Sequence, residues 1–267
     1  MDRPLTVALM QPTFMPWLGY FALIESVDRF VFLDDFQFCR ETWGQRNRLF
    51  TGPAAGWITL PVKHSGTRAN YCDVRPMVDG FCDKLIGQIR RFYARAPYLP
   101  LVVEHLRTCF ESPPADLAGV NIAFIENTAR LIGLSADFGR SSVVGSTGKR
   151  SARLADILRR TGARRYHAAS GSAGYMLEDG VFPLPDVETR FQDFVPASYP
   201  QVQTTQFVPY LSVLDVLLQV GIDGTRAAIR EGSREFRSWD AAAAAIQQRT
   251  PASERSKPHD PLLEITP

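Results

Sequence analysis

The order of elements at the start of the chain constrains its fold more than any other feature. Residues 5–10 form an apolar run typical of a buried strand, and residues 11–20 are a turn rich in proline and aromatic side chains. Helical periodicity over residues 20–27 leads to a second apolar run at 29–33. A right-handed crossover makes two such strands parallel neighbours. The sequence therefore predicts an α/β fold with a ligand site at the carboxyl ends of its strands.

Composition favours one large domain with small-molecule partners. The chain has 267 residues, of which 45% are hydrophobic, and its net charge is only +2. Such a balance creates no global field toward nucleic acid or a membrane. No apolar run approaches the roughly 20 residues that span a bilayer, and the four cysteines show no CxxC spacing. We expect a reduced, cytoplasmic protein without a metal site or membrane partner. A tRNA-borne donor and a homodimer stay open.

A helical segment interrupts the α/β alternation. Residues 57–62 predict a third strand, which ends at Lys63 and His64, and three helical patterns separated by prolines then follow between residues 78 and 133. We expect this insertion to cover the ligand edge and to contribute Tyr93 and Tyr98. Alternation then resumes, with strands expected at 141–144, 163–168 and 187–194 and helices at 152–160 and 211–220.

The chain is expected to divide near residue 230. Residues 1–230, with the insertion at 78–133, predict one α/β domain of the catalytic type. Beyond Glu231 the sequence turns to Ala, Gln, Arg, Ser and Pro without periodicity. Residues 231–267 are therefore predicted to be a C-terminal extension, largely disordered after about residue 250.

Four titratable residues at strand ends are the catalytic candidates. Asp34 and Asp35 follow the second strand, and two adjacent carboxylates raise the pKa of one of them, which suits a general base. Capping a helix is an equal alternative for one of the pair. Lys63 can bind an anion or act as a nucleophile, and His64 can accept a proton or be an ordinary surface residue.

Amide, hydroxyl, aromatic and guanidinium groups near the strand ends are the binding candidates. Arg46 and Asn47 lie in a polar segment that is either a solvated loop or an anion clamp. Ser170 to Ser172 can hold an oxyanion or form a tight turn, and Trp17 and Trp43 can line a pocket or fill the core. The full set is Gln11, Trp17, Tyr20, Gln37, Trp43, Arg46, Asn47, Tyr93, Tyr98, Thr147, Lys149, Ser170, Gly171, Ser172, Tyr175 and Gln201.

Three separated blocks of the chain resemble the WbqC-like family. They lie at residues 11–21, 32–37 and 43–48. The resemblance continues at 60–63, 93–98, 166–175, 199–201 and 207–215, and so covers about residues 5–222. Members of that family are found in gene clusters for surface polysaccharides and specialised metabolites. The resemblance implies a biosynthetic enzyme, and we expect acyl or aminoacyl transfer from an activated or carrier-bound donor to an amino group of a sugar nucleotide or metabolite.

Residues 13–20 are also similar to the opening of the HIGH-motif nucleotidyltransferases. That comparison implies a Rossmann-like sheet and places the loop at 145–151, with Lys149 and Arg150, at the nucleotide phosphates. Trp17 and Tyr20 stand where the two histidines of the motif would be, and indole and phenol replace imidazoles poorly as donors to a transition state. The alternative function is therefore ATP-dependent activation of a carboxylate or phosphate. A third is a non-catalytic small-molecule or carrier-binding protein, and the sequence requires no cofactor.

Overall fold

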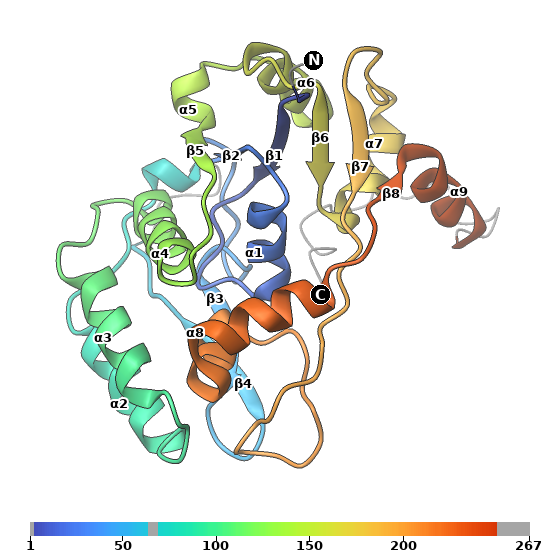
Figure 1. Ribbon diagram of the computed structural model, residues 1–267. Coiled ribbons are helices and arrows are strands. Elements are labelled where there is room, and N and C mark those ends of the chain that lie inside the picture. The colour runs from blue at the N-terminus through green and yellow to red at the C-terminus, as the bar shows by residue number, and fades with distance from the viewer. Residues whose placement is uncertain (1–2, 64–68, 250–267) are drawn as a thin grey trace.

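A mostly parallel sheet forms the centre of the molecule (Figure 1). The computed structural model describes residues 3–63 and 69–249. In the described chain the strand order is β5-β2-β1-β6-β7-β8, and only β8 is antiparallel to its neighbour. This order places β1 at the point where the chain reverses its direction of travel across the sheet, which confirms a Rossmann-like α/β fold. The strands are β1 (Thr6–Met10), β2 (Arg29–Phe32), β5 (Asp137–Arg140), β6 (Arg165–Ala168), β7 (Glu188–Phe191) and β8 (Arg237–Ser238).

Helices cover the two faces of the sheet because successive strand side chains point to opposite sides. Ala8 belongs to the core shared with α1, α4 and α8, whereas Val7 and Leu9 belong to the core shared with α6, α7 and α9. Helix α1 is buried on all sides, as expected for a helix that is apolar around its whole circumference. The covering helices are α1 (Leu18–Glu25), α4 (Leu117–Leu131), α6 (Arg150–Arg160), α7 (Ala173–Asp179), α8 (Val213–Gly232) and α9 (Trp239–Arg249).

The helical insertion lies beside the α1 face. It consists of α2 (Phe81–Phe92), α3 (Leu99–Phe110) and α4, between the second sheet and β5. Figure 1 shows α2 and α3 at one end of the molecule, opposite β8 and α9. The side chains of α2 that are buried are Leu85, Ile86 and Ile89, which share one face of the helix. Truncation of a buried side chain of this size costs about 2–5 kcal/mol of stability.

The third predicted strand belongs to a different sheet. Residues 55–59 form β4 (Ala55–Thr59), which pairs antiparallel with β3 (Arg46–Phe50) and not with β1 or β2. The sequence left open whether residues 46–48 form a solvated loop or an anion clamp. The structure shows that they belong to a strand, β3. The alternation of buried and exposed side chains along β3 cannot be seen in the sequence, because one of its buried positions is the polar residue Asn47. The side chain of Asn47 is 1% exposed, and its hydrogen bonds to main-chain carbonyls make that burial possible.

Other boundaries also differ from the expectation. Residues 141–144 form a short helix, α5 (Ser141–Val144), where a strand was predicted, and β5 ends just before it. Val143 is 81% exposed, so the pattern that predicted a strand reflects the β propensity of this residue and not its burial. The predicted helix end at Gly221 is a kink with φ of 68°, and α8 continues to Gly232. The aperiodic segment after Glu231 supplies β8 and α9, whereas residues 250–267 lie outside the described part.

Candidate functional site

The carboxyl edge of the sheet brings together the segments that follow β1, β2, β5 and β6. The chain reverses its direction across the sheet between β1 and β6, and ligands of open α/β sheets bind at that point. Gln11 follows β1, and a short turn of 3₁₀-helix, Ser170–Ser172, follows β6. We call the side chains at the ends of β1, β2, β5 and β6, with the loop at 145–149, the carboxyl-edge site.

The two adjacent aspartates after β2 have different surroundings. Asp34 is 2% exposed and accepts hydrogen bonds from the Ser142 backbone N–H (3.0 Å), the Ser142 hydroxyl (2.6 Å) and the Ser141 hydroxyl (3.2 Å). It therefore holds the first residues of α5, as an N-cap carboxylate does. Asp35 is partly exposed and accepts from Ser141 and from the guanidinium of Arg153.

Arg153 was not among the candidates, yet it joins three parts of the edge. Its guanidinium pairs with Asp35, donates to the Ser146 hydroxyl at 3.0 Å and lies 4.4 Å above the ring centre of Phe36. A guanidinium suits this position because its planar fork can donate in several directions and stack on an aromatic face. One signal in the sequence could have indicated Arg153 as a site residue: it belongs to a group of basic residues, with Lys149 and Arg150, at the start of α6.

The loop between α5 and α6 is held at both ends by aspartates. The backbone N–H and hydroxyl of Thr147 donate to Asp156 at 2.8 and 3.3 Å. Ser151 donates in the same way to Asp179 at 3.2 and 2.6 Å. The Thr147 bonds lower the pKa of the Asp156 carboxyl. Lys149, between these anchors, is exposed and its ammonium has no bonding partner among the described residues.

The turn between β1 and α1 is fixed by buried amides. Asn47 is 1% exposed and donates to the carbonyls of Phe14 and Met15 at 3.0 and 2.9 Å. Asn121, on α4, is fully buried and donates to the carbonyls of Pro12 and Gly44 at 2.7 and 2.8 Å. Neither amide is directed to a ligand, because each satisfies main-chain carbonyls that the turn leaves without partners.

Gln11 is the polar group that this turn presents beside the edge. Its side-chain oxygen accepts from the buried Tyr71 hydroxyl at 3.4 Å, and its carbonyl accepts from the Tyr20 hydroxyl at 3.0 Å. Tyr20 is 3% exposed, and burial raises its pKa. Trp17 is half-buried and packs against the rings of Phe194 and Tyr210, each 5.3 Å away. Trp17 and Tyr20 are thus engaged within the protein.

An aromatic and cationic group lies on the β3–β4 hairpin. The rings of Trp43 and Trp57 are 5.0 Å apart, and the Arg46 guanidinium lies 4.4 Å above the Trp57 ring. The Arg46 Nε atom is buried without a hydrogen-bond partner among the described residues. Trp57 is 48% exposed, so this group reaches the surface.

The remaining candidates lie in the turn after β6 and at two exposed positions elsewhere, Gln37 and Lys63. Ser170 is exposed, and the Ser172 hydroxyl donates to the Ala169 carbonyl at 2.6 Å, so Ser172 contributes to the turn itself. Gly171 and Tyr175 lie with them after β6, and burial raises the pKa of Tyr175. The side chains of Lys63 and Gln37 are exposed. His64 lies outside the described residues.

Three candidates belong to the packing of α8 and not to the edge. Tyr93 is fully buried and donates to Asp215 at 2.6 Å, and Gln201 donates to the same carboxylate at 3.1 Å. Tyr199 donates to it at 2.7 Å. The ring of Tyr98 lies against Gly221, where a Cβ atom would approach it to 2.5 Å, so the kink of α8 makes room for this ring. The insertion thus places both tyrosines at α8.

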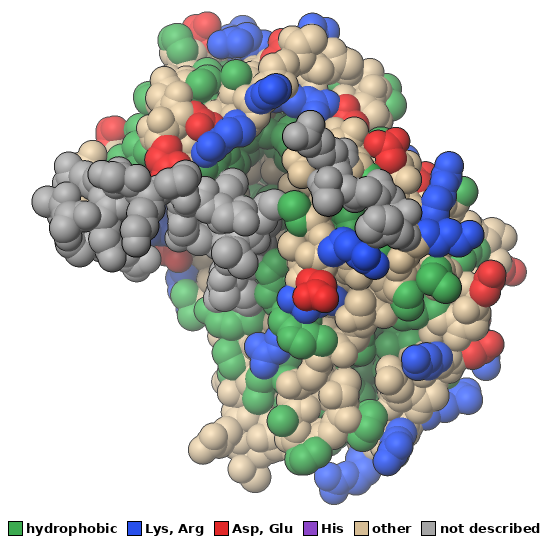
Figure 2. All heavy atoms as spheres, turned by 180° about the vertical axis from the view of Figure 1, so that it is seen from behind, with side chains coloured by type: hydrophobic (Ala, Val, Ile, Leu, Met, Phe, Trp, Pro, Cys, Tyr) green, Lys and Arg blue, Asp and Glu red, His purple; other side chains and the backbone are tan. Residues whose placement is uncertain are grey.

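No cluster of three or more metal-ligating side chains occurs in residues 3–63 and 69–249. Within the same residues, no helix is both long and apolar enough to cross a membrane. Figure 2 shows basic and acidic side chains interspersed over the back of the molecule, as the small net charge of +2 requires.

The family of the chain follows from comparisons with known proteins. A model of the WbqC-like protein family matches residues 11–227. A relative from Mycobacterium tuberculosis (strain ATCC 25618 / H37Rv), the uncharacterized protein Rv1507c, is 26% identical over 220 residues, which is 81% of this chain and 94% of the relative. No solved structure is significantly similar to the chain. The chain therefore belongs to the WbqC-like protein family, as its three motif blocks predicted.

Proposed function

We propose that this protein is a cytoplasmic biosynthetic transferase that binds a phosphate-bearing small molecule at the carboxyl-edge site. It adds an acyl or aminoacyl group to an amino group of that molecule, a sugar nucleotide or a specialised metabolite. The observation that carries the proposal is that the exposed ammonium of Lys149 has no bonding partner within residues 3–63 and 69–249, in a loop that Asp156 and Asp179 anchor at the start of α6. A cationic side chain held on a fixed loop is a favourable partner for a phosphate.

The anchoring pattern supports an anion site over a simple turn. Thr147 and Ser151 each give both a backbone N–H and a hydroxyl to a carboxylate, which fixes the loop on either side of Lys149. Arg150 pairs with Asp179 at 3.1 Å, so its charge is already balanced. As far as the described part of the chain goes, Lys149 is therefore the cation of this loop without a paired carboxylate, and it can bind an anionic ligand.

The chemistry is an acyl transfer. The amine nitrogen attacks the carbonyl carbon of the donor, a base accepts the proton that the nitrogen loses, and the leaving group departs with the electrons of its bond to the acyl carbon. Asp35 is the better base of the aspartate pair, because Asp34 already accepts three hydrogen bonds. Lys63 or the Ser170 turn supplies the donor for the oxyanion, and His64 is the alternative base.

The test combines ligand binding with product detection. Purified protein is titrated with amino-sugar nucleotides, and then incubated with acyl-thioester or aminoacylated-tRNA donors while the mass of the acceptor is followed. We expect Lys149→Ala to weaken nucleotide binding about tenfold, as loss of a charge-assisted contact does. The control Lys84→Ala removes an exposed cation from α2 and should change nothing. Equal effects of the two variants, or acceptor masses that never change, would contradict the proposal.

ATP-dependent activation is the competing outcome of the same assay. The Rossmann-like strand order and the anchored loop favour nucleotide binding in either case. Trp17 packs on aromatic rings and the Tyr20 hydroxyl is bonded to Gln11, so neither replaces an imidazole as a donor to a leaving phosphate. We expect no release of pyrophosphate from ATP or CTP with carboxylate or phosphate co-substrates. Robust release would establish activation in place of transfer.

A further inference from the structure

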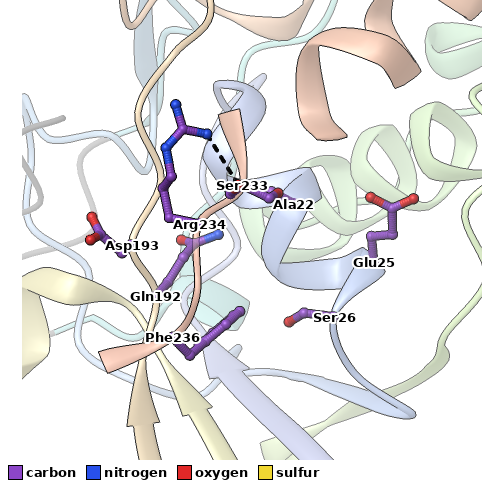
Figure 3. Close-up of a pocket in the computed structure, with 8 residues that line it drawn as sticks. All are labelled: Ala22, Glu25, Ser26, Gln192, Asp193, Ser233, Arg234 and Phe236. Atoms are coloured by element: carbon purple, nitrogen blue, oxygen red, sulfur yellow. Dashed lines mark hydrogen bonds between the residues drawn. The ribbon is translucent and has the colours of Figure 1, made fainter. Parts of the chain in front are cut away.

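A cavity lies on the α1 face of the sheet, on the opposite face from α6 and the Lys149 loop. It has a volume of about 210 Å³ and is lined by the end of α1, the residues after β7 and the segment before β8 (Figure 3). Drug-sized ligands occupy about 300–1,000 Å³. This cavity is therefore suited to a smaller molecule. Its lining residues are Ala22, Glu25, Ser26, Gln192, Asp193, Ser233, Arg234 and Phe236.

The cavity exists because no helix from the described residues 3–63 and 69–249 lies over this part of the sheet. Parallel sheets are normally covered on both faces. Over β6 and β7, however, the α1 face carries the charged residues Arg165, Glu188 and Arg190, which form ion pairs of 2.6–2.8 Å. Figure 1 shows no helix in front of these two strands. The segment before β8 crosses the face instead, and the space beneath it is the cavity.

The inner wall of the cavity is preorganised. The ring of Phe236 stacks on His167 with ring centres 4.0 Å apart, and His167 Nδ1 is 3.1 Å from the Ser26 hydroxyl oxygen. Burial lowers the pKa of His167 to about 4, so this wall is neutral at pH 7. Gln192 is 7% exposed, and its amide N–H₂ donates to the Gly19 carbonyl at 2.8 Å. A neutral, fixed wall suits the uncharged part of a ligand.

Opposite charges lie on facing walls. Figure 3 shows Glu25 on the α1 side and Arg234 on the other side. Among the described residues, the charged partner of Glu25 is Arg230, and the atoms of this loose pair are 4.0 Å apart. Arg234 donates through Nη1 to the carbonyls of Glu231 and Ser233, and its other nitrogens make no bond in the described part of the chain. In the described part of the chain neither Glu25 nor Arg234 forms an ion pair shorter than 4.0 Å, and the Asp193 carboxylate lies on the Arg234 side of the cavity.

We propose that this cavity binds a small zwitterion of the amino-acid class. The ammonium group pairs with Glu25, the carboxylate group pairs with Arg234, and the remaining atoms lie against Phe236 and Ser26. A guanidinium fork is the side chain that best matches a carboxylate. The inference goes beyond the proposed transferase activity and does not depend on it, because no cavity residue belongs to the carboxyl-edge site.

Three matched probes test the proposal. Alanine carries both charges, ethylamine carries only the ammonium and propionate carries only the carboxylate. Dissociation constants are measured by saturation-transfer NMR on the full chain. We expect alanine to bind at least tenfold more tightly than either single-charge probe. Glycine, β-alanine and 4-aminobutanoate then report the separation of the two charges that the cavity accepts.

Two surface variants separate the charges. Glu25→Gln should weaken alanine about tenfold and leave propionate unchanged, whereas Arg234→Gln should weaken alanine about tenfold and leave ethylamine unchanged. Glu25 and Arg234 are exposed, so both variants should fold. The control Glu104→Gln removes an exposed carboxylate from α3, and Lys149→Ala should also leave alanine binding unaltered. Equal affinity for the three probes, no binding of alanine at tens of millimolar, or insensitivity to both charge variants would overturn the proposal.

Discussion

Two carboxylates in this protein accept several hydrogen bonds each, yet their settings are opposite. Asp35, at the end of β2, is partly exposed and pairs with the guanidinium of Arg153. Asp215, on α8, is fully buried and is bonded by neutral donors, namely two tyrosine hydroxyls and one amide. A carboxylate with a cation and access to solvent can exchange partners with a ligand, whereas one sealed among neutral donors fixes the positions of the elements around it.

The Asp215 network is expected to dominate stability. Through Tyr93 and Tyr199 it joins the end of α2 and the loop before α8 to that helix, and the Tyr93 hydroxyl also accepts from the Phe50 backbone N–H at 3.0 Å. Asp215→Ala removes the acceptor of the Tyr93 and Tyr199 hydroxyls and one of the acceptors of the Gln201 amide. We therefore expect a loss of about 3–5 kcal/mol in the free energy of unfolding, measured by urea denaturation.

A loss of less than about 1 kcal/mol in the free energy of unfolding of Asp215→Ala would show that the Asp215 network is not a main source of stability. A matched control is Asp223→Ala, which removes a carboxylate from the second half of the same helix, where the side chain is exposed. That change should alter stability by no more than about 0.5 kcal/mol.

The sequence predicted the parallel sheet and the insertion because apolar periodicity reports burial directly. It missed β3 because burial of Asn47 depends on carbonyls of a turn more than 30 positions away. It missed α5 for a similar reason, because that helix is capped by Asp34, which is 107 positions from Ser141. Arg153 was overlooked because its partner, Asp35, is equally distant in the chain. Polar residues at strand ends therefore identified the edge, while their pairing depended on tertiary contacts.

The pH dependence of stability separates the two carboxylates further. Burial raises the pKa of Asp215 above its ordinary value of 3.8, so the folded protein holds this proton more tightly than the unfolded chain does. The stability contributed by the protonated group is complete below the unfolded pKa and is lost as the pH rises through the folded pKa. We expect the free energy of unfolding of the wild type, relative to Asp215→Asn, to fall as the pH rises above the ordinary carboxyl pKa of 3.8. Urea denaturation of both proteins at several pH values measures it, and parallel profiles would contradict it.

Changes in the turn that presents Gln11 should reduce stability less than changes at Asp215 and more than changes at the Asp35–Arg153 pair. Asn121 donates to the carbonyls of Pro12 and Gly44 from a fully buried position on α4. Asn121→Ala leaves both carbonyls without a side-chain partner, and we expect a loss of about 1–3 kcal/mol in the free energy of unfolding. Asn121→Asp should cost more than Asn121→Ala, because a carboxylate cannot donate to a carbonyl. The reverse order, measured by thermal unfolding, would show that volume and not hydrogen bonding governs this site.

The smallest effect on stability is expected where the effect on ligand binding is largest. The Asp35–Arg153 pair is partly exposed, so solvent screens it, and a double-mutant cycle with Asp35→Asn and Arg153→Gln should give a coupling energy of no more than about 1 kcal/mol. The same variants disturb the contact of Arg153 with Ser146, next to the Lys149 loop, and should weaken binding of a phosphate-bearing ligand several-fold. A coupling energy near that of the Asp215 network, with ligand affinity unchanged, would make both carboxylates structural. The difference between the two regions would then be one of exposure and not of function.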